Sequence, residues 1–196
     1  MSEFLSLKNI EKRFPIPGKE DYIAVTDVDL EIKKNEIIAI IGHSGCGKST
    51  LLNMISGLDG QTQGDIILNG HEVKGPGPDR AVVFQNHSLL PWLSVYENIE
   101  MAVKKVMPEL DALELRERVE KFVSMVNLEP AKDKLPGEIS GGMKQRVGIA
   151  RALSIQPDVL LMDEPFGALD SLTRANLQEH LMRIQKSVEN TVIIIT

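Results

Sequence analysis

The sequence contains little cysteine and no long hydrophobic run. Its single cysteine among 196 residues, Cys46, cannot form an internal disulfide, which favours a reducing compartment. The apolar runs, such as residues 37–41, are far shorter than the roughly 20 residues that a membrane-spanning helix needs. The N-terminus carries Glu3 early and has no apolar segment of signal-peptide length. We therefore expect a cytosolic chain that meets a membrane only through a partner.

Positive charge is also scarce. The chain has 22 Lys and Arg against 28 Asp and Glu, which gives a net charge of -6. A nucleic-acid-binding protein usually has a basic face, and no run of lysine or arginine supplies one here. The four histidines and the cysteine lack the spacing of metal ligands. The composition therefore argues against a nucleic-acid partner and against a metal site built from these side chains.

Short apolar runs rich in β-branched residues are present and predict an α/β fold. Strands that are buried on both faces of a parallel sheet have this character, and helical patterns separate the runs. The predicted strands are residues 37–41, 81–84, 158–162 and 191–195. We expect all of them to be buried on both faces of one parallel sheet.

Two other regions have a different pattern. Residues 4–32 and 65–69 alternate more and favour a small antiparallel sheet, whereas residues 88–155 are mostly helical and contain no buried-strand pattern. We expect a single domain over residues 1–196. Its core and antiparallel sheet would come from residues 1–87 and 156–196, and residues 88–155 would form a helical subdomain.

Residues 42–50, GHSGCGKST, match the phosphate-binding pattern G-x-x-x-x-G-K-S between a predicted strand and an apolar helix. Glycines let backbone N–H groups curl round a phosphate, and the helix that follows adds roughly +0.5 of positive charge. Lys48 is expected to reach the β- and γ-phosphates, and the Ser49 hydroxyl to bind Mg²⁺. The strand and helix disfavour a chance turn. The predicted phosphate contacts are Gly42, His43, Ser44, Gly45, Cys46, Gly47, Lys48, Ser49 and Thr50.

Two adjacent carboxylates, Asp163 and Glu164, follow the apolar run at 158–162. Ligand sites of parallel sheets gather at the carboxyl ends of the strands, and neighbouring strand residues point to opposite faces. Asp163 therefore suits the Mg²⁺ shell, whereas Glu164 suits polarisation of an attacking water. An Asp-Glu pair alone would be an ordinary solvated strand end.

Three further motifs complete a resemblance. ISGGMKQR (139–146), LLMDE (160–164) and FGALD (166–170), together with GHSGCGKST, resemble the ATPase subunit of an ABC transporter over nearly the whole chain. The resemblance implies a P-loop NTPase with a RecA-like parallel core that binds ATP and Mg²⁺. It also implies that two ATPase subunits pack head to tail, as a homodimer or a heterodimer.

The resemblance gives ISGGM its role. In the family this loop covers the nucleotide held by the partner's phosphate loop, so the Ser140 hydroxyl would contact the partner's γ-phosphate. Gly141 and Gly142 would offer backbone N–H groups to it, and the helix that begins at Met143 would point its positive end at the same phosphate. By local chemistry alone, Ser is a favoured helix N-cap and glycine permits close approach of a ligand. An ordinary capped helix is the alternative.

Three single positions also match the family. The resemblance implies that Gln85 contacts Mg²⁺ and senses the helical segment, and that Phe14 stacks on adenine. Tyr22 is the second candidate for stacking, and a buried core position is the alternative for Phe14. Asp170 matches a loop that crosses the dimer interface.

Residues 42–58 and 75–99 are most similar to ATPases of the nitrate, sulfonate, taurine and bicarbonate uptake group. The resemblance implies a peripheral subunit at the cytoplasmic face of a bacterial inner membrane. Its partners would be transmembrane permease subunits and, indirectly, a periplasmic binding protein. Residues 86–100 would include the permease contact, and the solute would be nitrate or a related small anion.

The sequence stops at TVIIIT (191–196), before the position where the family has a switch histidine. We therefore expect ATP binding with weak hydrolysis by the isolated chain. A soluble ABC-type ATPase of DNA repair or translation and a non-hydrolytic nucleotide-binding module are the alternatives. A simple kinase would leave ISGGM unexplained.

Overall fold

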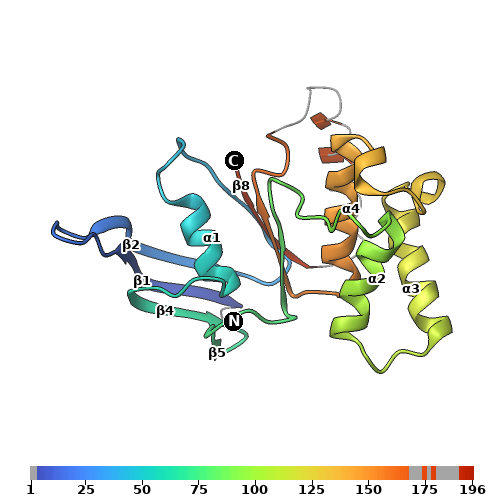
Figure 1. Ribbon diagram of the computed structural model, residues 1–196. Helices are drawn as coiled ribbons and strands as arrows, with labels where there is room; N and C mark the ends of the chain where they lie inside the picture. The colour runs from blue at the N-terminus through green and yellow to red at the C-terminus, as the bar shows by residue number, and fades with distance from the viewer. Residues whose placement is uncertain (1–3, 168–173, 176–177, 180–189) are drawn as a thin grey trace.

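The computed structural model describes residues 4–167, 174–175, 178–179 and 190–196. Figure 1 shows α1 (Lys48–Ser56) on one side of the parallel strands, near the antiparallel sheet, and the helices of residues 95–154 gathered on the opposite side. This arrangement confirms the predicted α/β fold with an antiparallel sheet and a helical segment. In the part of the chain described, no helix is both long and apolar enough to cross a membrane.

The antiparallel sheet has the strand order β2-β1-β4-β5. Its strands are β1 (Leu5–Phe14), β2 (Tyr22–Ile32), β4 (Gln63–Leu68) and β5 (His71–Glu72). Leu5, Leu7 and Ile10 of β1 are fully buried and pack with residues of α1 in one hydrophobic core. The alternation in the sequence thus correctly predicted β1, β2 and β4, whereas the short β5 gave no pattern.

The parallel sheet has the order β3-β8-β7-β6. Its strands are β3 (Ile37–Ile40), β6 (Arg80–Val83), β7 (Val159–Asp163) and β8 (Thr191–Ile195). Successive residues of β7 alternate between two cores: Leu161 packs with α1 and the antiparallel sheet, while Leu160 and Met162 pack with the helical segment. The parallel sheet therefore forms the wall between both cores.

The predicted burial of residues 37–41 on both faces is wrong. β3 is an edge strand of the sheet, and its only ladder among the described residues is with β8. Ile37 is 42% exposed and Ile41 is 79% exposed. An apolar β-branched run predicts a strand but not its place in the sheet, which long-range pairing decides. β6, at the other edge, alternates between buried and half-buried residues, so only β7 and β8 match the prediction.

Capped helices form the helical segment. They are α2 (Val95–Val106), α3 (Ala112–Met125) and α4 (Gly141–Ser154), with short 3₁₀ turns η1 (Glu129–Ala131) and η2 (Pro136–Glu138). Ser94 caps α2 and Asp111 caps α3, each in a reciprocal box with a glutamate three residues on. Ile99, Val119 and Val147 are fully buried between the helices. The helical segment therefore shares a continuous core with one face of the parallel sheet.

Candidate functional site

The phosphate loop connects β3 to α1, and its geometry requires glycine at one position. Gly47 has φ 94° at the start of α1, and a Cβ there would lie 2.3 Å from the carbonyl oxygen of Ala24. No side chain caps α1, and the first helical bond runs from the Leu51 N–H to the Gly47 carbonyl. The N–H groups of residues 48–50 therefore have no partner within the helix and remain available to an anion.

Lys48 lies beneath this loop and is only 9% exposed. Its ammonium donates to the carbonyl oxygens of Gly42 at 2.6 Å and His43 at 3.0 Å. These bonds hold the ammonium within the loop, so the positive charge is already placed where a phosphate would enter. Cys46 and His43 are exposed on the rim of the loop.

A cavity of about 190 Å³ adjoins the loop. Its wall contains Ser44, Gly45 and the start of α1 on one side, and Phe14 and Tyr22 on another. The two aromatic residues are Cα partners in the ladder between β1 and β2, and they are 39% and 53% exposed. Phe14 is therefore no core residue, and an aromatic pair adjoins the phosphate loop.

Asp163 and Glu164 have separate environments at the end of β7. The Ser49 hydroxyl donates to Asp163 Oδ1 at 3.1 Å, whereas Glu164 lines the cavity. Glu164 has φ 43°, and its N–H donates to the Ile195 carbonyl at 3.1 Å. A left-handed backbone is unfavourable for a residue other than glycine and often marks a functional site. The two carboxylates thus lie in the same region but face different neighbours.

Gln85 follows β6 and reaches the neighbourhood of Glu164. A Cβ on Gly167 would lie 3.6 Å from Glu164 Oε2 and 3.7 Å from Gln85 Nε2, so both side chains lie close to this glycine. In the described ranges, no three His, Cys, Asp or Glu side chains are placed to hold a metal ion. A metal at Asp163 would need further oxygen ligands, such as the Ser49 hydroxyl that already bonds to this carboxylate and the phosphates of a bound nucleotide.

Ser140 caps α4, and its Oγ accepts a hydrogen bond from the Met143 N–H at 3.3 Å. Ser140 and Gly141 are exposed, and a Cβ on Gly141 would meet no atom within 4 Å. None of residues 140–143 is among the described residues lining the cavity. The chain therefore does not bring its own ISGGM loop to its own phosphate loop. Asp170 lies outside the described residues.

Arg151 is a structural neighbour of this site that the sequence motifs did not indicate. From α4 it donates to the carbonyls of Ser88 at 2.8 Å and His87 at 3.2 Å, just after Gln85. His87 and Ser88 both have positive φ, of 63° and 45°. Burial lowers the pKa of the Arg151 guanidinium. A lone arginine in a helix gives no pattern from which this contact could be predicted.

A glycine-rich loop between strand and helix, with a carboxylate pair at the end of another strand of the same sheet, defines a P-loop NTPase site. The family model described as ABC transporter matches residues 25–167. The chain therefore belongs to the ABC transporter family, as the motifs had indicated.

Named relatives and a solved structure agree with this family. The bicarbonate transport ATP-binding protein CmpC of Synechocystis sp. is 56% identical over 196 residues, and this chain spans 29% of its length. The nitrate import ATP-binding protein NrtD of Synechococcus elongatus is 51% identical over 193 residues, which are 98% of this chain and 70% of NrtD. The dimeric ATP-binding cassette MJ0796 bound to ADP and Pi has a TM-score of 0.85 at 34% identity, covering 98% of this chain and 87% of that chain.

Proposed function

We propose that this chain binds ATP with Mg²⁺ and hydrolyses it as the ATPase unit of an ABC importer. The observation that supports this most directly is one cavity lined by Lys48, Ser49 and Glu164. It offers a cation and helix N–H groups for phosphate, a hydroxyl for a metal and a carboxylate for water. These are the groups that phosphoryl transfer to water needs.

Substrate binding follows from the walls of the cavity. The N–H groups at the start of α1 and the Lys48 ammonium bind the phosphates, and Lys48 exchanges its bonds to two carbonyls for bonds to phosphate oxygens. Phe14 offers a ring face to adenine, with Tyr22 beside it. The Ser49 hydroxyl, the Asp163 carboxylate and the Gln85 amide supply the hard oxygen ligands that suit Mg²⁺, which when bound neutralises charge on the phosphates.

Hydrolysis requires a water in line with the γ-phosphorus. Glu164 accepts a hydrogen bond from this water and polarises it, and the oxygen of the water attacks the γ-phosphorus while the bond to the bridging oxygen of ADP breaks. The proton that the water loses passes to the Glu164 carboxylate and from there to solvent. The Gln85 side chain lies close to Gly167, as that of Glu164 does, and is placed to orient the same water or the metal. ADP leaves with the electrons of the broken bond, and phosphate carries the new oxygen.

A second subunit completes the site. The exposed Ser140 already accepts from Met143, which leaves its own O–H free to donate to a phosphate held by a partner. Gly141 and Gly142 allow that phosphate to approach, and α4 begins there with its positive end. The dimeric state of MJ0796 supports this arrangement, and Asp170 is proposed at the same interface.

Transport of a small anion is the proposed purpose. Relatives named for bicarbonate and nitrate import cover nearly all of this chain, and sulfonate or taurine would carry similar charge chemistry. The segment 86–100, in which Trp92 is 70% exposed, is the proposed permease contact at the cytoplasmic face of the inner membrane. A periplasmic binding protein would deliver the solute to the permease.

The test is Glu164→Gln, compared with Glu117→Gln at an exposed position of α3. Glu164→Gln should retain ATP binding, lose about 10²–10⁴-fold in hydrolysis, and form an ATP-dependent dimer in size-exclusion chromatography. The Glu117 variant should match the wild type. Equal hydrolysis by both variants would contradict the role of Glu164, and ATP binding without any wild-type turnover would favour a non-hydrolytic module.

A further inference from the structure

Lys12 lies behind Phe14, outside the cavity. The Lys12 ammonium is 5.0 Å from the centroid of the Phe14 ring, which is within the range of a cation–π interaction. Lys12 is not among the described residues that line the cavity, whereas Phe14 is. The cation is therefore placed to act on the aromatic wall of the cavity without touching a ligand inside it.

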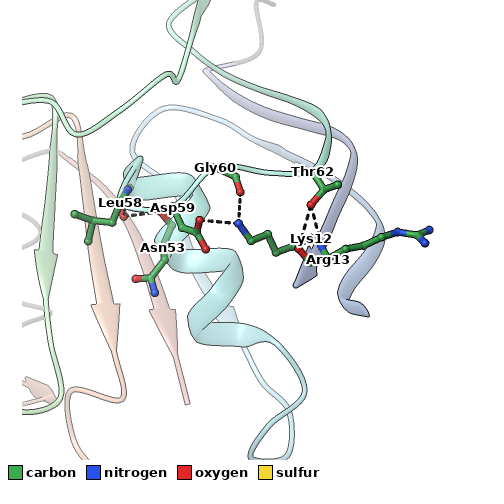
Figure 2. A network of polar contacts seen from close by, with 8 residues as sticks. Lys12, Arg13, Asn53, Leu58, Asp59, Gly60 and Thr62 are labelled. Atoms are coloured by element: carbon green, nitrogen blue, oxygen red, sulfur yellow. Dashed lines mark hydrogen bonds and ion pairs between the residues drawn. The ribbon is translucent and has the colours of Figure 1, made fainter. Parts of the chain in front are cut away.

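The same ammonium is fixed by two hydrogen bonds. It donates to Asp59 Oδ1 at 2.6 Å and to the Gly60 carbonyl at 2.6 Å, and the Lys12 side chain is only 12% exposed. An ammonium has three N–H donors, so one remains beside the two that bond to the turn. Figure 2 shows Lys12 reaching toward Asp59 and Gly60, while Arg13 points the opposite way.

Asp59 is itself attached to the helix that carries the phosphate loop. The N–H groups of Leu58 and Asp59 both donate to the Asn53 carbonyl near the end of α1, at 2.9 and 3.2 Å. The turn is also tied to β1, because the Arg13 N–H donates to Thr62 Oγ1 at 2.9 Å. Lys12 therefore links the strand that carries Phe14 to the helix that begins at Lys48 (Figure 2).

We propose that Lys12 is a positioning residue for adenine recognition: through its bonds to Asp59 and Gly60 it holds the Phe14 ring against the nucleotide cavity. The proposal rests on the proposed function, in which Phe14 stacks on adenine. A ring on a strand end that is 39% exposed has other rotamers open to it, and a fixed cation on one face favours a single one. The ring then offers its remaining surface to the base at little cost in entropy.

The test measures the Kd of Lys12→Met and of the wild type for two ligands, ATP and inorganic tripolyphosphate, each with Mg²⁺. Lys12→Met keeps an unbranched apolar stem but removes the charge. Its Kd for ATP should rise about three- to tenfold, because the ring loses its cation, and its Kd for tripolyphosphate should stay within about twofold of the wild type. Lys12→Arg should restore most of the ATP affinity.

Arg13→Met is the matched control. Arg13 is adjacent to Lys12 and is also ion-paired, with Glu11, but its side chain points away from Asp59 and Gly60. It should change neither Kd. If Lys12→Met does not fold, Asp59→Asn carries the same comparison, since it removes the charged partner and leaves Lys12 in place; the ATP-selective loss should then be smaller but present.

Three results would overturn the proposal. Unchanged ATP affinity in the folded Lys12→Met variant would contradict the role of Lys12. An equal loss of affinity for both ligands would show a general structural effect. Neither result would contradict the proposed function. A wild type that binds tripolyphosphate as tightly as ATP would instead contradict adenine stacking on Phe14 and the role of Lys12 with it.

Discussion

The Ser49 hydroxyl donates to Asp163 Oδ1 at 3.1 Å, which joins the first turn of α1 to the end of β7 across 114 positions of sequence. The loop and the strand end were separate motifs in the sequence. Their contact places a hydroxyl and a carboxylate on one side of the phosphate cavity, where a hard cation would be bound. The relationship therefore ties the proposed metal site to the packing of the parallel sheet.

Asp163→Asn should weaken the proposed Mg²⁺ site while leaving the local fold intact. Asparagine still offers an oxygen to Ser49, but it lacks the negative charge that attracts the metal and its waters. The Mg²⁺ concentration needed for half-maximal nucleotide binding should rise about 10–100-fold. Asp65→Asn, at an exposed position of β4, should not change it. A Mg²⁺ titration that is the same for both variants would contradict the assignment.

Gly47→Ala and Gly45→Ala separate backbone strain from a steric clash. Both glycines have positive φ, of 94° and 81°, so each alanine should cost about 1–2 kcal/mol of folding free energy. A Cβ at Gly45 meets nothing within 4 Å, whereas one at Gly47 lies 2.3 Å from the Ala24 carbonyl. Gly47→Ala should therefore cost about 1–3 kcal/mol more. Urea unfolding of both variants gives the difference, and equal midpoints would contradict it.

The fold and most of the site could be predicted because their patterns are local. The phosphate loop is a run of nine residues between a strand and a helix, and Asp163 and Glu164 directly follow an apolar run, so sequence order alone indicates where each lies. The edge position of β3 could not be predicted in this way. Ile37 pairs with Val192 of β8, which is far away in the sequence. The residues near Ile37 do not indicate whether β3 has a second neighbouring strand in the sheet.

The contacts of Lys12 and Arg151 were also beyond sequence patterns. Lys12 meets Asp59 at a separation of 47 residues, and Arg151 meets Ser88 at a separation of 63. Charged side chains are common on strands and helices, and a solvated position is the usual outcome. Tertiary packing alone decides which of these side chains form hydrogen bonds between distant segments, so only the structure identifies Lys12 and Arg151.

Asn98→Ala should destabilise the segment that precedes α2. Asn98 is fully buried; its side chain accepts from the Leu90 N–H and donates to the carbonyls of Leu90, Leu93 and Ser94. Removing this amide takes away the hydrogen-bond partner of the Leu90 N–H and of the Leu93 carbonyl, at a cost of about 2–3 kcal/mol. Met101→Ala, at a position of α2 that is 39% exposed, should cost about 0.5 kcal/mol or less.

Trp92 provides a local readout of the same change, because it is the only tryptophan and lies in the segment that Asn98 holds. Its fluorescence should shift in Asn98→Ala under conditions where circular dichroism still shows a folded protein. A spectrum like that of the wild type, with unchanged urea midpoint, would show that the segment is held by other contacts.

Arg151→Met should separate nucleotide binding from hydrolysis. Arg151 fixes the carbonyls of His87 and Ser88, which lie two and three residues after Gln85, and Gln85 reaches the neighbourhood of Glu164. Without the guanidinium, two carbonyls lose a charged donor, and stability should fall by about 1–3 kcal/mol. The phosphate loop does not contact Arg151, so KM for ATP should change little, while kcat falls about 10-fold or more as Gln85 loses its position.

Two comparisons make this last test specific. Arg151→Lys keeps the charge but lacks the fork that reaches two carbonyls at once, so its kcat should fall between those of the wild type and Arg151→Met. Arg116→Met removes an exposed arginine of α3 that pairs with Glu120, and should cost about 0.5 kcal/mol or less with unchanged kcat. If Arg151→Met raised KM and left kcat unchanged, its contact with the 87–88 backbone would serve the binding site rather than the placement of Gln85.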